Sequence, residues 1–258
     1  MSSTSAGNIQ ARHVQWFGLV AFFALLWVPL GQTPFLVEHW MKVGVFFAPL
    51  LLLAMATGQA PEARWSIGDL PVASALLLVA YIAHQFEEHW IDAFGNPYAF
   101  YDTVNALLQG ALGLDETEVL SREGIFVINT SLVWLVGALA IVRSDRHAFP
   151  ALAMAAIALF NAVTHVLAAV ATRSYNPGLV TSIVVFAPVC LLVYRRYYDG
   201  TPERRRRIAA SLLWSVLAHV VMVGGTIAAN AFGAIPERAY FVALVFWSIV
   251  PCFLFRDR

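Results

Sequence analysis

The chain is a succession of long apolar segments that are separated by short polar ones. Each apolar segment is about 20 residues long, which is the length that an α-helix needs to cross a hydrocarbon core of roughly 30 Å. The segments do not alternate apolar and polar residues as membrane-spanning strands do, so we predict helices. We predict about eight spans, over residues 13–33, 35–57, 71–92, 125–143, 149–172, 178–198, 203–233 and 237–255.

Prolines mark several of the predicted helix starts. Proline is tolerated in the first helical turn, where its missing N–H is not needed. The prolines that lie at or just before an apolar segment are Pro34, Pro71, Pro150, Pro177, Pro202 and Pro236. Residues 31–34 are the only punctuation between the first two predicted helices.

The basic residues predict the orientation of the spans. With eight spans and a cytoplasmic N-terminus, four basic residues fall on the outer side: Lys42, Arg122, Arg173 and Arg238. The inner side then receives twelve arginines, at positions 12, 64, 143, 146, 195, 196, 204, 205, 206, 207, 256 and 258. Because cytoplasmic loops carry an excess of Lys and Arg, both termini are predicted in the cytoplasm.

Composition agrees with a membrane protein. Hydrophobic residues make up 60% of the chain and charged residues 12%, whereas soluble domains carry roughly 25% charged residues. We therefore predict an all-α, polytopic transmembrane bundle that forms one domain over residues 1–258. The sequence has no basic surface interleaved with aromatic residues, so no nucleic-acid partner is expected.

The longest connection, residues 93–124, is predicted on the outer side. It opens with a turn signal, Phe94-Gly95-Asn96-Pro97-Tyr98, and residues 101–114 could form a short interfacial helix. Connections of this length are often functional, for example as lids over a site.

The third apolar segment contains the run His84-Gln85-Phe86-Glu87-Glu88. Residues three and four apart share a helix face, so His84, Glu87 and Glu88 can point toward one spot. Each carboxylate is costly away from water unless it is paired or binds a metal. Imidazole and carboxylate ligands on one face indicate a divalent metal site.

Other polar residues fall at the same predicted depth. His165 lies in the later half of the fifth segment, Asn161 lies four residues before it, and Asn129 lies near the outer start of the fourth. Tyr175 lies in the turn that follows the fifth segment. Asn129 and Asn161 could instead only bridge helices by hydrogen bonds. His89 points away from the face of His84, so we expect it to support the site from outside.

These residues resemble a bacterial family of membrane proteins named for an HXXEE motif. The matching elements are His84-Gln85-Phe86-Glu87-Glu88, then Asn161 and His165, and then Tyr175-Asn176-Pro177-Gly178. The resemblance covers roughly residues 70–200. It implies a site of a shared type and lends no reaction, and it favours a bacterial inner membrane as the location.

The favoured function is a membrane-embedded, metal-dependent enzyme that acts on a lipid, an isoprenoid or another apolar small molecule. One or two zinc or iron ions would be held by His84, Glu87, Glu88 and His165. Glu87 or Glu88 would act as a general base, and Asn161, Asn129 and Tyr175 would orient ligand, water or substrate. Membrane lipids and the apolar substrate are the expected partners, and a homo-oligomer is compatible with the sequence.

Two other functions fit the same residues. A metal-free isoprenoid cyclase or isomerase would use Glu87 or Glu88 as its proton donor. A transporter would use the carboxylates and histidines to relay protons or to bind a coupling ion.

Overall fold

The computed structural model describes residues 17–57, 69–144 and 146–255, and this part of the chain is helical without strands. Phe17–Gln32 forms the first helix described. It is followed by α2 (Pro34–Thr57), α3 (Leu70–His89), α4 (Ala99–Leu112), α5 (Arg122–Ile128), α6 (Val136–Arg143), α7 (Phe149–Thr172), α8 (Leu179–Thr181), α9 (Ala187–Tyr197), α10 (Pro202–Thr226) and α11 (Glu237–Ile249). Three π-helical segments continue these helices: η2 (Asn129–Leu135), η3 (Ser182–Phe186) and η4 (Ile227–Ala231).

Six helices in the described part of the chain are long and apolar enough to cross a membrane, so the prediction of eight spans is wrong. They are Pro34–Leu53, Leu70–His89, Arg122–Arg143, Phe149–Thr172, Leu179–Tyr197 and Pro202–Ala231. By their length and composition, these apolar helices indicate a membrane protein. The cytoplasmic position of both termini stays a prediction.

The two predicted spans that fall short are the first and the last. The described part of the first, Phe17–Gln32, is a shorter apolar helix, and residues 13–16 lie outside the described part. The last, α11, has 13 residues, or about 20 Å at 1.5 Å per residue, which is less than a core of about 30 Å. A 3₁₀ turn over Val250–Cys252, with Pro251 inside it, then ends the regular helix.

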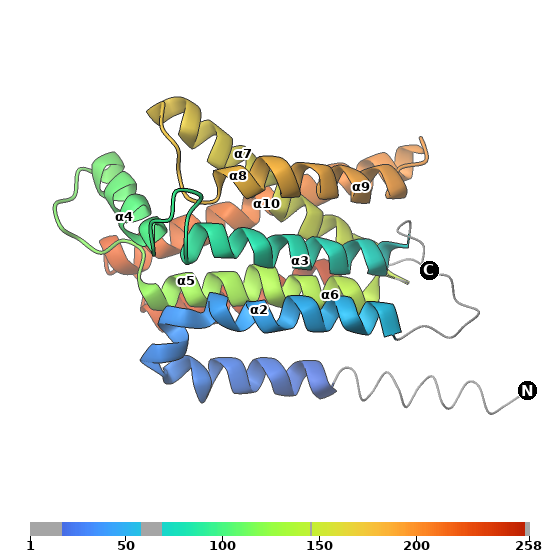
Figure 1. Cartoon of the computed structure of the whole chain (residues 1–258), viewed down its shortest axis with the longest axis horizontal. Coiled ribbons are helices and arrows are strands. Elements are labelled where there is room, and N and C mark those ends of the chain that lie inside the picture. The colour runs from blue at the N-terminus through green and yellow to red at the C-terminus, as the bar shows by residue number, and fades with distance from the viewer. Residues whose placement is uncertain (1–16, 58–68, 145, 256–258) are drawn as a thin grey trace, which may run out of the picture.

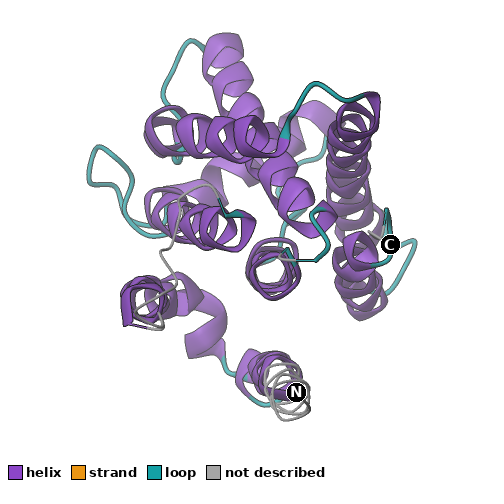
Figure 2. Cartoon of the chain, turned by 90° about the vertical axis from the view of Figure 1, so that its right-hand side faces the viewer, coloured by secondary structure: helices purple, strands orange, loops and turns teal. Residues whose placement is uncertain are grey.

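Successive helices run back and forth along one axis, as Figure 1 shows. The spans Leu70–His89 and Arg122–Arg143 are 61% and 78% buried, against 22–44% for the other four, so they form the centre of the bundle. Phe17–Gln32 lies at the edge beside α2 (Figures 1 and 2), where Phe17, Val20 and Leu25 are exposed. Exposed apolar side chains of this kind suit a lipid surface.

The ends of α3 and α7 and the starts of α5 and α8 lie at the same end of the bundle (Figure 1). The first and last of the eight predicted spans fall short, but the other six still alternate in direction. These four helix ends therefore remain at the same end of the bundle. The polar residues predicted at one depth therefore come from helix ends that meet.

The long connection after α3 contains α4, and a buried asparagine on α4 ties this helix to the segment that follows it. Asn105 accepts hydrogen bonds from the backbone N–H groups of Val119 (3.0 Å) and Leu120 (2.9 Å), and its amide donates to the Leu120 carbonyl (3.0 Å). Tyr101 donates to Glu118 (2.5 Å). Burial and Glu118 raise the pKa of Tyr101 to about 12, so its hydroxyl remains a donor at neutral pH.

Candidate metal centre

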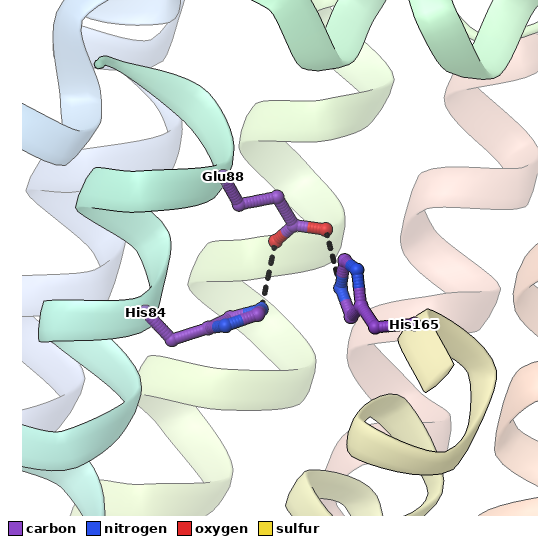
Figure 3. A group of neighbouring side chains, drawn as sticks. All are labelled: His84, Glu88 and His165. Atoms are coloured by element: carbon purple, nitrogen blue, oxygen red, sulfur yellow. Dashed lines mark ion pairs between the residues drawn. The ribbon is translucent and has the colours of Figure 1, made fainter. Parts of the chain in front are cut away.

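Two histidines and one glutamate converge between α3 and α7. His84 and Glu88 are four residues apart on α3 and share a face, and His165 reaches them from α7 (Figure 3). His84 Nε2 lies 3.3 Å from Glu88 Oε2, and His165 Nε2 lies 3.3 Å from Glu88 Oε1. All three side chains are buried, and one ligand atom of each lies within 4.8 Å of the others. Such a group could hold a metal ion.

A hydrogen bond fixes the orientation of His165. Its Nδ1 lies 2.6 Å from Oδ1 of Asn176, and the Asn176 amide nitrogen donates to the backbone carbonyl of His165 at 2.9 Å. Because that second bond identifies the amide oxygen, Nδ1 of His165 must be the donor. In a neutral imidazole, Nε2 then carries a lone pair, and it faces Glu88.

Thr181 fixes the orientation of His84 in the same way. Its hydroxyl donates to Glu87 Oε2 at 2.6 Å, so its oxygen accepts from His84 Nδ1 at 2.9 Å. Nε2 of His84 is therefore also left with a lone pair toward Glu88. Histidines that bind metals commonly donate their second nitrogen to such an outer partner, which sets the tautomer.

The lone pair on each imidazole nitrogen and the negative charge of the Glu88 carboxylate repel one another. A cation or added protons must therefore offset the charge there. The contacts of 3.3 Å are longer than a charge-assisted hydrogen bond of about 2.7–2.9 Å. One ligand atom of each of the three residues lies within 4.8 Å of the others, a spacing at which two imidazole nitrogens and a carboxylate oxygen could share one metal ion. The donor set therefore fits a divalent metal.

The described residues supply only histidines as ion-pair partners of Glu88. Lys42 is engaged elsewhere, since its Nζ lies 5.1 Å from the ring centre of Trp90 and 5.7 Å from that of Tyr98. A metal ion would supply the positive charge that this part of the chain does not bring to the carboxylate.

The structure places Glu87 outside this group. Its Oε1 accepts from the Tyr175 hydroxyl (3.0 Å) and the Val180 N–H (3.0 Å), and its Oε2 accepts from the N–H (2.7 Å) and hydroxyl (2.6 Å) of Thr181. Four donors thus satisfy the carboxylate at the start of α8, where helix N–H groups have no partner within the helix. Glu87 acts there as a cap supplied by another helix.

Tyr175 belongs to the surroundings of Glu87. Its hydroxyl donates to Glu87 and accepts from the backbone N–H of Ala93 at 3.0 Å, so it ties the end of α3 to the α7–α8 turn. Burial raises the pKa of Tyr175, and the hydrogen bond to Glu87 raises it further. The phenol therefore remains protonated at neutral pH and keeps donating.

Asn161 lies beside the metal-binding group. Its amide nitrogen is 3.2 Å from His84 Nε2 and donates to the Tyr81 hydroxyl at 3.1 Å. This contact places an N–H donor next to the ligand atom of His84. Asn161 can therefore orient a group that approaches that atom.

A chain of side chains leads to Glu88 from the other side, and it joins Asn129 and His89, which the sequence pointed to, with Trp134, which it did not. Trp134 donates to Gln85 (2.9 Å), the Gln85 amide donates to Asn129 (3.0 Å), and the Asn129 amide lies 3.2 Å from His89 Nε2. Indole nitrogen is donor only, so Trp134 fixes the direction of both amides. His89 Nε2 is 3.0 Å from Glu88 Oε2, which makes it a direct neighbour of the site.

We expected His89 to lie outside the site because its direction was judged from α3 alone. Its position directly after Glu88 in the sequence was the one signal that could have placed the two side chains in contact. Thr181 carried no signal, because nothing in the sequence links it to residues about 90 positions earlier.

Gly178 forms the wall behind both imidazoles. Its φ is +94°, and a Cβ at this position would lie 2.7 Å from His84 Cε1 and 2.8 Å from His165 Cε1. Only glycine adopts this conformation freely and also leaves room for the two rings. The glycine of the Tyr-Asn-Pro-Gly turn is thus explained by the space that the histidines occupy.

The two π-helical segments near the site begin at, or directly after, a residue that supports it. η2 starts at Asn129, and η3 starts directly after Thr181. π-Helical turns are frequent at functional sites, because they change the direction of neighbouring side chains without ending the helix.

Comparison with known proteins agrees with this part of the chain. The sequence model of a family described as "Protein of unknown function with HXXEE motif" matches residues 75–193, which include His84, Glu88, His165 and Gly178. No curated protein and no solved structure matches the chain. The resemblance seen in the sequence is confirmed: residues 75–193 match the model of the HXXEE-motif family.

Proposed function

We propose that this protein is a membrane-embedded enzyme that uses a divalent metal, zinc or iron(II), to act on a lipid, an isoprenoid or another apolar small molecule. The observation that carries the proposal is the convergence of three ligand atoms from His84, Glu88 and His165, with both histidines oriented by outer hydrogen bonds. Two histidines and one carboxylate are a common set for catalytic zinc and for non-haem iron(II), and the set leaves positions open for water or substrate.

The metal would act as a Lewis acid that polarises a substrate oxygen or activates water. The residues of the chain would do the rest. Glu88 and the two histidines would hold the ion, and Asn161 would donate a hydrogen bond beside His84. His89 would hold or move a proton, because its Nε2 contacts Glu88 and it also lines a small cavity.

That cavity suggests how a substrate would reach the site. It lies between α2, α3, α4 and α5, its lining includes Glu38, Tyr98 and Tyr101, and its volume is about 20 Å³. This volume holds about one water molecule and no lipid chain. A substrate that enters here requires movement of the connection 93–124, so we assign α4 the role of a lid.

An apolar substrate is favoured by the position of the site. The ligands lie in membrane-spanning helices, and the helices around them expose apolar side chains such as Val166, Val170 and Val180. A molecule dissolved in the bilayer could approach such a surface without leaving the apolar phase.

The first test is the metal content of the full chain, purified in detergent with a tag that contains no histidine. Mass spectrometry of the elements should find about one equivalent of zinc or iron in the wild type and in His219→Ala. His219 is a matched control because it lies on α10 and contacts the Ser215 carbonyl at 2.8 Å. His165→Ala should lose the metal.

The second test is lipid analysis of membranes from cells that produce the wild type, His165→Ala or His219→Ala. The wild type and His219→Ala should change the amount of the same apolar compound, and His165→Ala should not. A protein free of metal that still changes this compound would contradict the metal-dependent enzyme. It would favour proton transfer by Glu88, which contacts three imidazoles.

A further inference from the structure

A second polar cavity lies where α6, α7, α9 and α10 meet. Its volume is about 610 Å³, and its lining includes Ser144, Arg146, Arg196, Thr201, Arg204 and Arg207. The α7 helix begins at Phe149, beside this cavity, and His165 lies 16 residues later, or about 24 Å along the helix axis. The cavity is therefore separate from the metal centre.

The lining is strongly basic. Among the described residues that line it, four are arginines and one, Glu203, is a carboxylate. Glu203 pairs with Arg207 at 2.8 Å, and Asp199 nearby pairs with Arg204 at 3.2 Å. Arg196 forms no ion pair within the described part of the chain. A positive potential thus remains at the cavity after these pairs are counted.

Two further groups in the wall favour an anion. The α10 helix begins at Pro202 with Thr201 as its N-cap, and the positive end of a helix dipole attracts negative charge. Ser144 lines the cavity, is 5% exposed, and its hydroxyl has no hydrogen-bond partner among the described residues. A buried hydroxyl of this kind is free to donate to a bound oxygen.

The cavity also lies at the membrane boundary. The spans Leu179–Tyr197 and Pro202–Ala231 end and begin there, so the cavity is at the depth of lipid headgroups. Its volume is within the range of small-molecule sites. Arginine presents several N–H groups in a plane and binds phosphate through pairs of hydrogen bonds.

We propose that this cavity binds a phosphate group, either that of an anionic lipid headgroup or that of a soluble phosphate. Basic pockets between membrane-spanning helices on the cytoplasmic side commonly take such headgroups. Arg196 provides charge that no ion pair in the described part of the chain offsets, and Ser144 and the start of α10 provide further donors.

Adjacent arginines on the same helix allow a matched test. Arg196 lines the cavity, whereas Arg195, the residue before it, does not, and both are exposed on the last turn of α9. The comparison removes the same charge at the same end of the same helix.

The experiment measures binding of phosphatidylglycerol and phosphatidylcholine to the full chain in detergent micelles, at low salt, with inorganic phosphate as a separate arm. Phosphatidylglycerol should bind more tightly than phosphatidylcholine. Arg196→Gln should weaken its binding about fivefold, which is the usual contribution of one arginine near an anionic surface, and Arg195→Gln should change it less than about twofold. Arg196→Lys should restore part of the affinity, and melting curves will identify any variant that does not fold.

The arms distinguish the source of the phosphate. Binding of phosphatidylglycerol that depends on Arg196 and resists inorganic phosphate supports a lipid headgroup. Displacement by inorganic phosphate, with the same dependence on Arg196, supports a soluble phosphate. Equal losses in Arg195→Gln and Arg196→Gln would overturn the proposal, because general attraction of a basic surface would then suffice. Phosphatidylglycerol that binds no more tightly than the zwitterionic phosphatidylcholine, together with no binding of inorganic phosphate, would also overturn it, because the cavity would then not select an anionic phosphate.

Discussion

Glu87 and Glu88 are neighbours in the sequence, yet their side chains lie in two chemically different regions. Glu87 faces the start of α8, where four hydrogen-bond donors satisfy its oxygens. Glu88 faces imidazole nitrogens, two of which present lone pairs to it at 3.3 Å. The first region is complete as it stands and holds helices together. The second requires a cation or protons, and chemistry is expected there.

A buried carboxylate is therefore not in itself evidence of a site. A carboxylate whose oxygens accept hydrogen bonds from neutral donors has a structural role, as at the N-terminus of many helices. A buried carboxylate that faces hydrogen-bond acceptors carries a negative charge that a cation or protons must offset. Thr181 connects the two regions, because its oxygen contacts both His84 and Glu87.

The largest effect is expected from Gly178→Ala, which disturbs both regions. The new Cβ would press on His84 and His165, so metal affinity should fall about 100-fold. The φ of +94° should lower the free energy of unfolding by about 1–2 kcal/mol. Metal titration and thermal unfolding measure the two effects.

Gly95→Ala is the matched control, since its φ is +86° and no atom lies within 4 Å of the added Cβ. It should show a similar loss of stability and normal metal affinity. Equal metal affinity in both variants would show that Gly178 does not shape the site.

A smaller effect is expected from Asn176→Leu, which acts only on the region of Glu88. It removes the acceptor for His165 Nδ1, so the ring loses its fixed tautomer and metal affinity should fall about 10–100-fold. Asn176→Asp keeps an acceptor at this position and should lose less affinity. If the two variants bind metal equally well, the hydrogen bond does not orient His165.

The smallest effect is expected from Thr181→Val, which preserves the shape of the residue and removes the link between the regions. Metal affinity should fall about tenfold, because His84 loses its outer partner. The free energy of unfolding should fall by about 1–2 kcal/mol, because Glu87 loses a donor. Thr181→Ser keeps the hydroxyl and should behave like the wild type.

The sequence predicted the helical membrane fold and most helix bounds, because hydropathy and proline positions report directly on spans. It overestimated the number of spans, because an apolar stretch at residues 237–255 does not reveal that the regular helix stops after 13 residues. The length of an apolar segment sets an upper limit on a helix and does not fix its end.

The candidate site was predictable where helical spacing decides it. His84 and Glu88 are four residues apart, so they share a face whatever surrounds the helix. Glu87 was predicted as a ligand by the same rule, since it is three residues from His84. Adjacent residues point about 100° apart on a helix, however, and which of them meets α7 and which meets α8 depends on packing. Helical spacing alone does not carry that information.

The most direct test of the account compares the metal content of Glu87→Gln and Glu88→Gln, purified side by side in detergent as full chains. Each variant removes one charge and changes the side-chain shape little, and the two positions are adjacent. We predict that Glu87→Gln retains metal at the wild-type level and melts at a lower temperature, and that Glu88→Gln keeps less than about one-tenth of the metal while remaining folded. A folded Glu88→Gln protein with full metal content, or a folded Glu87→Gln protein without metal, would contradict the assignment of Glu88 as the ligand and Glu87 as the cap.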